Sequence, residues 1–286
     1  MDTEAEGRAA AQHFRREHRL GVQPLGDLVT VIEQTTGVDV AVLDAGPDEH
    51  GLAMRDSDRG VVFIGVARTE HPMRQRSTLA HELAHVLFED WTDAEVGDWS
   101  EPSLREARCR AFARHLLVPV EGVHEFLQDP QEVTLALLSA VVQRFLVSPA
   151  IAAIALEQAR YIDHATSQKW GEFYTPQLAA RFGWTDQYRA LQAESSKRRT
   201  PQRLLARAIN GYAIGVLPAQ AIATLRGITL AEAEADLREA GVEPADSTVT
   251  WARAADLPDV DVDLSDLDDG TGDDGGPEAG AGRGSG

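Results

Sequence analysis

The stretch that decides the fold is Ser77-Thr78-Leu79-Ala80-His81-Glu82-Leu83-Ala84-His85-Val86-Leu87-Phe88. On an α-helix, residues four positions apart lie on the same face, so His81 and His85 can present two imidazole nitrogens to one metal ion. Glu82 lies beside them, where a carboxylate can accept a proton from water and return it to a leaving amine. The stretch therefore predicts a helix that carries a metal site, with Glu82 as general base.

The alternative is a coincidence of residues on a core helix. Apolar side chains occur on two sides of the predicted helix, which places it in the interior rather than on the surface. The chain also holds His124-Glu125-Phe126-Leu127-Gln128, which opens in the same way but lacks the second histidine. We interpret the first stretch as a metal site and do not interpret the second as one.

Two histidines do not hold a metal ion alone, so a third ligand has to come from another segment. The candidates are Glu101, Glu106, Cys109 and His115. Glu106 is favoured because helical spacing places it on the interior face with Cys109, where an unpaired carboxylate is costly unless a cation meets it. A salt bridge from Glu106 to a nearby arginine (Arg74, Arg105 or Arg110) is the alternative. Three protein ligands plus water is the arrangement of catalytic rather than structural zinc sites.

Composition describes a soluble protein of 286 residues, 43% of them hydrophobic, which is enough for a substantial core. There is no apolar run long enough to cross a membrane, and the N-terminus is acidic where a signal peptide is basic and then apolar. We therefore expect a cytoplasmic protein without a membrane partner. The lone Cys109 excludes an intramolecular disulfide and a cysteine-rich zinc module.

The net charge of -19 argues against a general nucleic-acid binder, because contacts to phosphates need a surplus of lysine and arginine. The charge is uneven, since residues 256–286 hold ten acidic residues against one arginine, or -9, which leaves -10 for the rest. We expect residues 244–286 to form a disordered acidic tail, because the segment is rich in Asp and Gly and offers almost no apolar surface to bury. A calcium loop at Asp259–Asp263 is rejected, because Leu264 stands where that loop needs glycine.

Local patterns predict an α+β fold that is mostly helical. Helices are expected over about 3–19 and 24–37, followed by strands at 38–43 and 59–66. The metal-site helix comes next, and then a helix from Ser103 to Leu117 that Val118-Pro119 ends. Two further helices joined at Ser148-Pro149 are expected between 132 and 165. A small sheet beside the metal helix can hold a peptide substrate by backbone pairing along its edge strand.

Two separated motifs carry a family resemblance. The segment Ser77–His85, followed by Glu106 and then Phe112-Ala113-Arg114-His115-Leu116-Leu117-Val118-Pro119, resembles the ImmA/IrrE family of metallo-endopeptidases. The resemblance covers about residues 5–125 and implies a small zincin-like, gluzincin-like domain with His81, His85 and Glu106 as zinc ligands and Glu82 as general base. Manganese is the other metal that such a site accepts. The resemblance also implies a regulatory protein substrate, such as a helix-turn-helix repressor in a mobile-element or stress response.

The chain departs from the family pattern at three positions. Ala84 replaces a glycine, and Cys109 and Arg110 replace an Ala-Asn pair, so Arg110 lies one turn from Glu106. The domain organisation we expect is a zincin-like domain at 1–130, a helical extension at 131–195, a helical subdomain at 196–243, and the tail. The helical subdomain at 196–243 has a helix-turn-helix outline around Leu217–Gly241. Its second helix is acidic, which argues against direct DNA contact.

The leading hypothesis is a zinc-dependent endopeptidase with a regulatory protein substrate. The oxyanion donor is open, with His115 and His124 as candidates. The main alternative is a binding module without catalysis that sequesters a repressor or antitoxin. A DNA-binding regulator acting through residues 217–241 is the third hypothesis.

Overall fold

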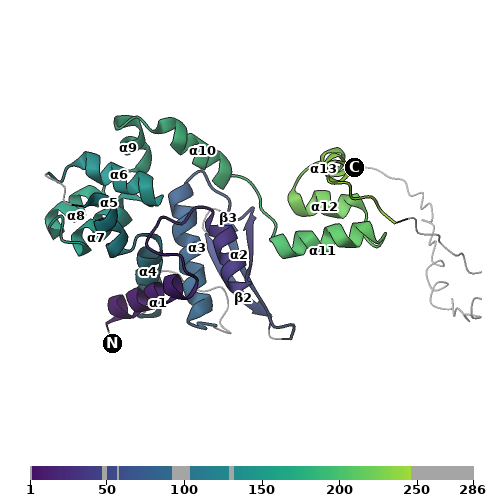
Figure 1. The fold of residues 1–286 in the computed structure, drawn as a ribbon, viewed down its shortest axis with the longest axis horizontal. Helices are drawn as coiled ribbons and strands as arrows, with labels where there is room; N and C mark the ends of the chain where they lie inside the picture. The colour runs from purple at the N-terminus through teal and green to yellow at the C-terminus, as the bar shows by residue number, and fades with distance from the viewer. Residues whose placement is uncertain (1, 47–49, 57, 92–103, 129–131, 246–286) are drawn as a thin grey trace, which may run out of the picture. The chain divides into compact units, whose positions relative to one another are not determined.

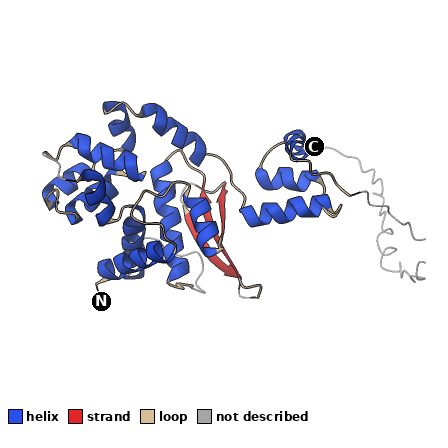
Figure 2. Cartoon of the chain, viewed as in Figure 1, coloured by secondary structure: helices blue, strands red, loops and turns tan. Residues whose placement is uncertain are grey.

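The computed structural model describes residues 2–46, 50–56, 58–91, 104–128 and 132–245. Within them the chain forms one small sheet and a series of helices, so the expected α+β, mostly helical class is confirmed (Figures 1 and 2). The helices are α1 Thr3–Glu17, α2 Leu28–Thr36, α3 Pro72–Leu87, α4 Leu104–Leu117, α5 Val120–Leu127, α6 Leu135–Phe145, α7 Pro149–Gln158, α8 His164–Gly171, α9 Thr175–Arg181, α10 Thr185–Ser195, α11 Gln202–Ala213, α12 Ala219–Arg226 and α13 Leu230–Glu239.

The sheet has the order β1-β3-β2, with β1 at Asp39–Leu43, β2 at Gly51–Asp56 and β3 at Val61–Ala67. β1 runs parallel to β3, and β2 runs antiparallel to β3 with Gly51 opposite Val66. β3 is therefore the central strand, and β2 lies at one edge. The sequence predicted β1 and β3 but not β2, because Gly51-Leu-Ala-Met-Arg-Asp56 contains no β-branched residue and gains its conformation from pairing with β3.

Helix starts follow local capping chemistry. α2 begins at Leu28 rather than near Pro24 as expected, because the side chain of Asp27 accepts a hydrogen bond from the Thr30 N–H and caps the helix there. α3 has Pro72 in its first turn, where the missing N–H costs nothing. The helix expected from Ser103 to Leu117 corresponds to α4. The sequence interpretation missed α5, which begins directly after Val118-Pro119.

One large hydrophobic cluster contains side chains from the sheet and from α1 to α10. Leu83 of α3, Phe112 of α4 and Ile64 of β3 are fully buried in it. α3 contacts α4 on one side and the sheet on another, so it is the central helix that its two apolar sides predicted (Figure 1). Leu87, at the end of α3, does not share this burial, since it is 41% exposed. This packing fixes the backbone from which the candidate site projects.

A second, smaller hydrophobic cluster belongs to α11, α12 and α13, and contains Ile222, Ala223 and Leu237. The helix, Gly227-containing turn and helix expected in this region are present. None of the described helices is individually long and apolar enough to span a membrane, and α6 with α7 passes that test only as a pair bent by 108°. Residues 246–286 of the expected acidic tail and the candidate ligand Glu101 lie outside the described residues.

Candidate metal site

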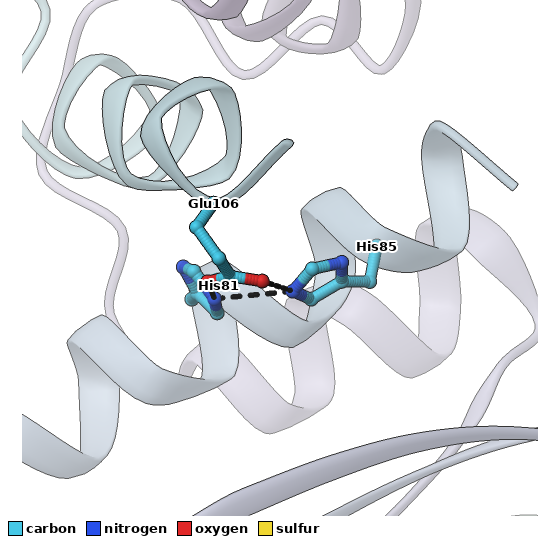
Figure 3. Close-up of side chains that lie close together, drawn as sticks. All are labelled: His81, His85 and Glu106. Atoms are coloured by element: carbon cyan, nitrogen blue, oxygen red, sulfur yellow. Dashed lines mark hydrogen bonds and ion pairs between the residues drawn. The ribbon is translucent and has the colours of Figure 1, made fainter. Parts of the chain in front are cut away.

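The predicted ligands lie on two neighbouring helices. His81 and His85 project from successive turns of α3, and Glu106 projects from the first turns of α4 (Figure 3). The two helices are held together by the apolar side chains between them, including Leu83 and Phe112. Because both backbones are fixed by the core, the three side chains meet without a loop having to close.

The ligand atoms of these three residues converge on one point. The Nε2 atoms of His81 and His85 are 3.1 Å apart, and the Glu106 carboxylate oxygens lie 3.0 Å from His81 Nε2 and 3.2 Å from His85 Nε2. Tetrahedral zinc with bonds of about 2.05 Å has ligand-to-ligand edges of about 3.3 Å. The Glu106 carboxylate presents Oε2 to His81 and Oε1 to His85 (Figure 3). These separations between donor atoms are close to those that such an ion requires, and the donor set of two imidazoles and a carboxylate fits a divalent metal.

The shifted pKa values of Glu106 and His85 suit metal binding. The side chains are sheltered, with 14% of each histidine and 20% of Glu106 exposed. Hydrogen bonding to His81 holds the pKa of Glu106 below its usual value, and the positive charge of Arg110 acts in the same direction. Burial lowers the pKa of His85. Ionised carboxylate and neutral imidazole are the forms that coordinate a metal. Arg110, which replaces the asparagine of the family pattern, therefore supports the ionised form of Glu106.

Glu82 is buried beside the ligands. Its side chain is 1% exposed, it accepts a hydrogen bond from the backbone N–H of Ala53 in β2, and its Oε1 atom has no hydrogen-bond partner among the described residues. Burial raises its pKa to about 7, partly opposed by His81 and reinforced by the charge of Glu106. A buried carboxylate oxygen without a partner is costly to fold, so it marks a place where a further polar group belongs. Such a pKa suits a group that accepts and returns a proton near neutral pH.

Gly51 explains how β2 reaches this carboxylate. A side chain at this position would place its Cβ 2.4 Å from Thr78 Cγ2 and 2.7 Å from Glu82 Oε1. Only glycine allows the edge strand to lie this close to α3. The edge strand and the buried carboxylate are therefore in direct contact, an arrangement that the sequence interpretation did not contain because it missed β2.

A second carboxylate, Asp90, lies behind His85. Its Oδ2 atom is 3.5 Å from His85 Nδ1, the nitrogen that faces away from the ligand group, and both of its oxygens accept hydrogen bonds from Arg108 at 2.9 and 3.0 Å. Arg108 also binds Glu6 of α1 at 2.7 Å. A carboxylate at the outer nitrogen of a metal-binding histidine orients the ring and its tautomer. The sequence interpretation missed Asp90 because it follows the end of α3, where helical spacing no longer predicts direction.

The other candidate residues lie elsewhere. Cys109 is buried, with its Sγ 3.6 Å from both His85 Nδ1 and Asp90 Oδ2. It therefore lies with Asp90 at the outer nitrogen of His85 and not with the three candidate ligands. Burial and the charge of Asp90 raise the pKa of its thiol far above the usual range, which keeps it protonated. His115 contacts Glu4 at 2.8 Å and His124 contacts the Tyr161 hydroxyl at 3.1 Å. The structure places neither of these histidines in the ligand group.

Comparisons with known proteins agree with this geometry. Residues 34–157 match the family model of the IrrE N-terminal-like domain, Peptidase_M78. The match includes the whole sheet, both helices that carry the three ligands, α5, α6 and all of α7 except its last residue. No curated protein matches the chain. Residues 34–157 are therefore an IrrE N-terminal-like domain of the ImmA/IrrE family, a metallopeptidase-like domain.

Proposed function

We propose that this chain is a zinc-dependent endopeptidase whose metal is held by His81, His85 and Glu106 and whose general base is Glu82. The observation that carries the proposal is the buried Glu82 carboxylate, with one oxygen left without a partner, directly beside three converging metal ligands. A purely structural zinc site would need a fourth protein ligand and no buried base.

When bound, a divalent ion at this site would polarise the substrate carbonyl and lower the pKa of the attacking water. The remaining steps belong to the chain. Glu82 accepts the proton of the attacking water at a carboxylate oxygen and passes it to the departing nitrogen. In the chain without metal, burial raises the pKa of Glu82 to about 7, and the positive charge of a bound ion would lower it and favour the ionised form that accepts the proton. The low exposure of the surrounding side chains excludes bulk water and so strengthens each electrostatic contact.

The edge strand β2 is the proposed seat of the substrate backbone. The Ala67 N–H donates a hydrogen bond to the His50 carbonyl. Backbone N–H and C=O groups alternate in direction along a strand, so those of Leu52 and Met54 point toward β3. The backbone groups of Gly51, Ala53 and Arg55 point to the open edge of the sheet. The hydrogen bond from Ala53 N–H to Glu82 agrees with this alternation. A peptide that adds to this edge as an extended strand would lie along the ligand group.

The substrate we propose is a regulatory protein, a helix-turn-helix repressor of a mobile-element or stress response. Membership of residues 34–157 in the ImmA/IrrE family supports this choice.

Glu82→Gln tests the mechanism. The substitution keeps the shape of the side chain but removes its ability to accept a proton, so we expect metal content to be unchanged and cleavage to fall by about 10²- to 10⁴-fold. Metal content is measured by elemental analysis, and cleavage is followed on blocked peptides and on candidate repressors. Undiminished cleavage in this variant would contradict the role of Glu82.

The alternative is a binding module that sequesters a repressor or antitoxin without cleaving it, with the metal structural or absent. No structural observation favours it over the peptidase. It predicts that partner binding and release of repression survive in Glu82→Gln, whereas the peptidase predicts that release of repression is lost.

A further inference from the structure

A small polar cavity of about 210 Å³ lies beside the candidate site. Thr78, one turn before Glu82 on α3, lines it, as does His50, the residue before β2. Gly51 connects the cavity to the site, because a Cβ at this position would collide with the side chains of both Thr78 and Glu82. The cavity is therefore the next space that a chain lying along β2 would enter.

The walls of the cavity suit an anion. The polar side chains that line it are Arg68, Arg74, Gln75, His50, Thr69 and Thr78, and no described carboxylate is among the lining residues. Arg68 forms an ion pair with Asp44. Arg74 makes no ion pair and no side-chain hydrogen bond with any residue that the structure describes. The guanidinium of Arg74 is therefore available to an anion that enters the cavity.

The direction of β2 tells which part of a substrate would reach this cavity. A substrate strand that adds antiparallel to β2 runs from the Asp56 end toward the Gly51 end. Its scissile bond lies at Glu82, whose carboxylate is bound to Ala53. The residues on the carboxyl side of that bond then pass Gly51 and come to His50 and Thr78.

We propose that this cavity is a specificity pocket for an acidic side chain, Asp or Glu, located shortly after the scissile bond of the substrate. Arg74 is the main binding group, and the Thr78 hydroxyl is a second donor. The inference rests on the proposed peptidase function and adds to it a substrate class, a peptide with a carboxylate on the carboxyl side of the cleaved bond.

The first test uses the full-length chain loaded with zinc and a library of blocked peptides of random sequence. A cleaved peptide is then resynthesised with Glu or with Gln at each of the first three positions after the scissile bond, always with an amidated C-terminus. We expect Glu at one position to raise kcat/KM about 3- to 5-fold over Gln, mainly through KM, as for a partly exposed ion pair. Arg74→Gln should reduce this ratio to about one, and Arg74→Lys should retain part of it.

The matched control is Arg59→Gln. Arg59 lies in the turn between β2 and β3 and is 82% exposed, so its loss removes the same charge without touching the cavity and should leave the ratio unchanged. Equal kcat/KM for the Glu and Gln peptides overturns the proposal while leaving the peptidase function intact. The Gln peptide is also made once with a free C-terminal carboxyl group, as a control. A gain that appears only with this control peptide also overturns the proposal, because the pocket would then bind a chain end.

A second test does not depend on cleavage. Backbone amide NMR spectra of the Glu82→Gln chain are recorded with N-acetyl-glutamic acid amide and with N-acetyl-glutamine amide. The proposal predicts shifts at Thr69 and Thr78 with the glutamate compound only, and their loss in the added Arg74→Gln variant. Equal shifts, or none, overturn the pocket. Failure to cleave any peptide would contradict the peptidase function, and this measurement would still decide the pocket.

Discussion

Two regions of this chain carry glutamates on helices: α3 with α4, which hold Glu82 and Glu106, and α13, which holds four acidic residues. Of these two regions, the first forms the candidate site. On α3 and α4, Glu82 and Glu106 point toward neighbouring side chains and lie largely out of water. On α13, Glu232, Glu234, Asp236 and Glu239 are all exposed. The difference is packing: α3 lies between the sheet and α4, whereas the small cluster of α11 to α13 buries apolar side chains and no carboxylate. Carboxylates acquire unusual chemistry where the fold removes water from them.

The largest expected effects on unfolding free energy come from substitutions in the two hydrophobic clusters, and only one of these substitutions should also change metal affinity. Phe112→Ala, in the fully buried contact between α4 and its neighbours, should cost about 3–5 kcal/mol of unfolding free energy and weaken metal binding. Ile222→Ala removes a side chain that is 1% exposed in the second cluster, at a cost of about 2–5 kcal/mol. It should leave metal affinity unchanged, because its cluster contains none of the site's supporting residues.

Denaturant unfolding, followed by circular dichroism with and without zinc, measures both variants. Equal loss of metal affinity in Phe112→Ala and Ile222→Ala would contradict this difference between the two regions, since it would mean that α11 to α13 support the candidate metal site.

The sequence predicted that His81, His85 and Glu106 meet, because these residues lie on regular helices. Periodicity alone places His81 and His85 on one face of a helix and Glu106 on an interior face of another. It did not predict β2, whose residues have weak strand preference and depend on β3, and therefore missed the contact of Gly51 with Glu82. It also missed Asp90, since the direction of a side chain just after a helix depends on tertiary contacts, here the hydrogen bonds from Arg108.

A smaller effect should come from Asp90, which sharpens the distinction between ligands and the groups that orient them. Asp90→Asn should lower zinc affinity about 10- to 100-fold, or about 1.4–2.7 kcal/mol, because the outer nitrogen of His85 loses its charged partner. Competition with a chelator of known affinity measures the change. Asp236→Asn, an exposed acidic residue of α13, is the matched control and should bind zinc as the native chain does. Equal affinity in Asp90→Asn would remove Asp90 from the site.

The smallest effect concerns Glu4, which joins α1 to α4 and α7 by accepting hydrogen bonds from His115 and Gln158. Its hydrogen bond to His115 and the charge of Arg114 lower its pKa to about 2, below the usual 4.5. The stabilisation is therefore complete above about pH 4.5 and is lost as pH falls toward 2. Since the side chain is 40% exposed, Glu4→Gln should cost only about 1 kcal/mol at pH 7.

Thermal unfolding at pH 7, 4 and 3 measures this contribution. The native chain and Glu4→Gln should converge in stability as the pH falls. A constant difference between them at all three pH values would show that the carboxylate charge of Glu4 is not what stabilises the contact.

The central claim is that His81, His85 and Glu106 form one metal site, and metal content tests it most directly. The native chain, Glu106→Gln and the control Glu234→Gln are purified without chelator, supplied with zinc, desalted and analysed for bound metal. The account predicts about one zinc per chain in the native protein and in Glu234→Gln, and its loss from Glu106→Gln. No metal in the native chain after zinc addition, or full retention in Glu106→Gln, would contradict it.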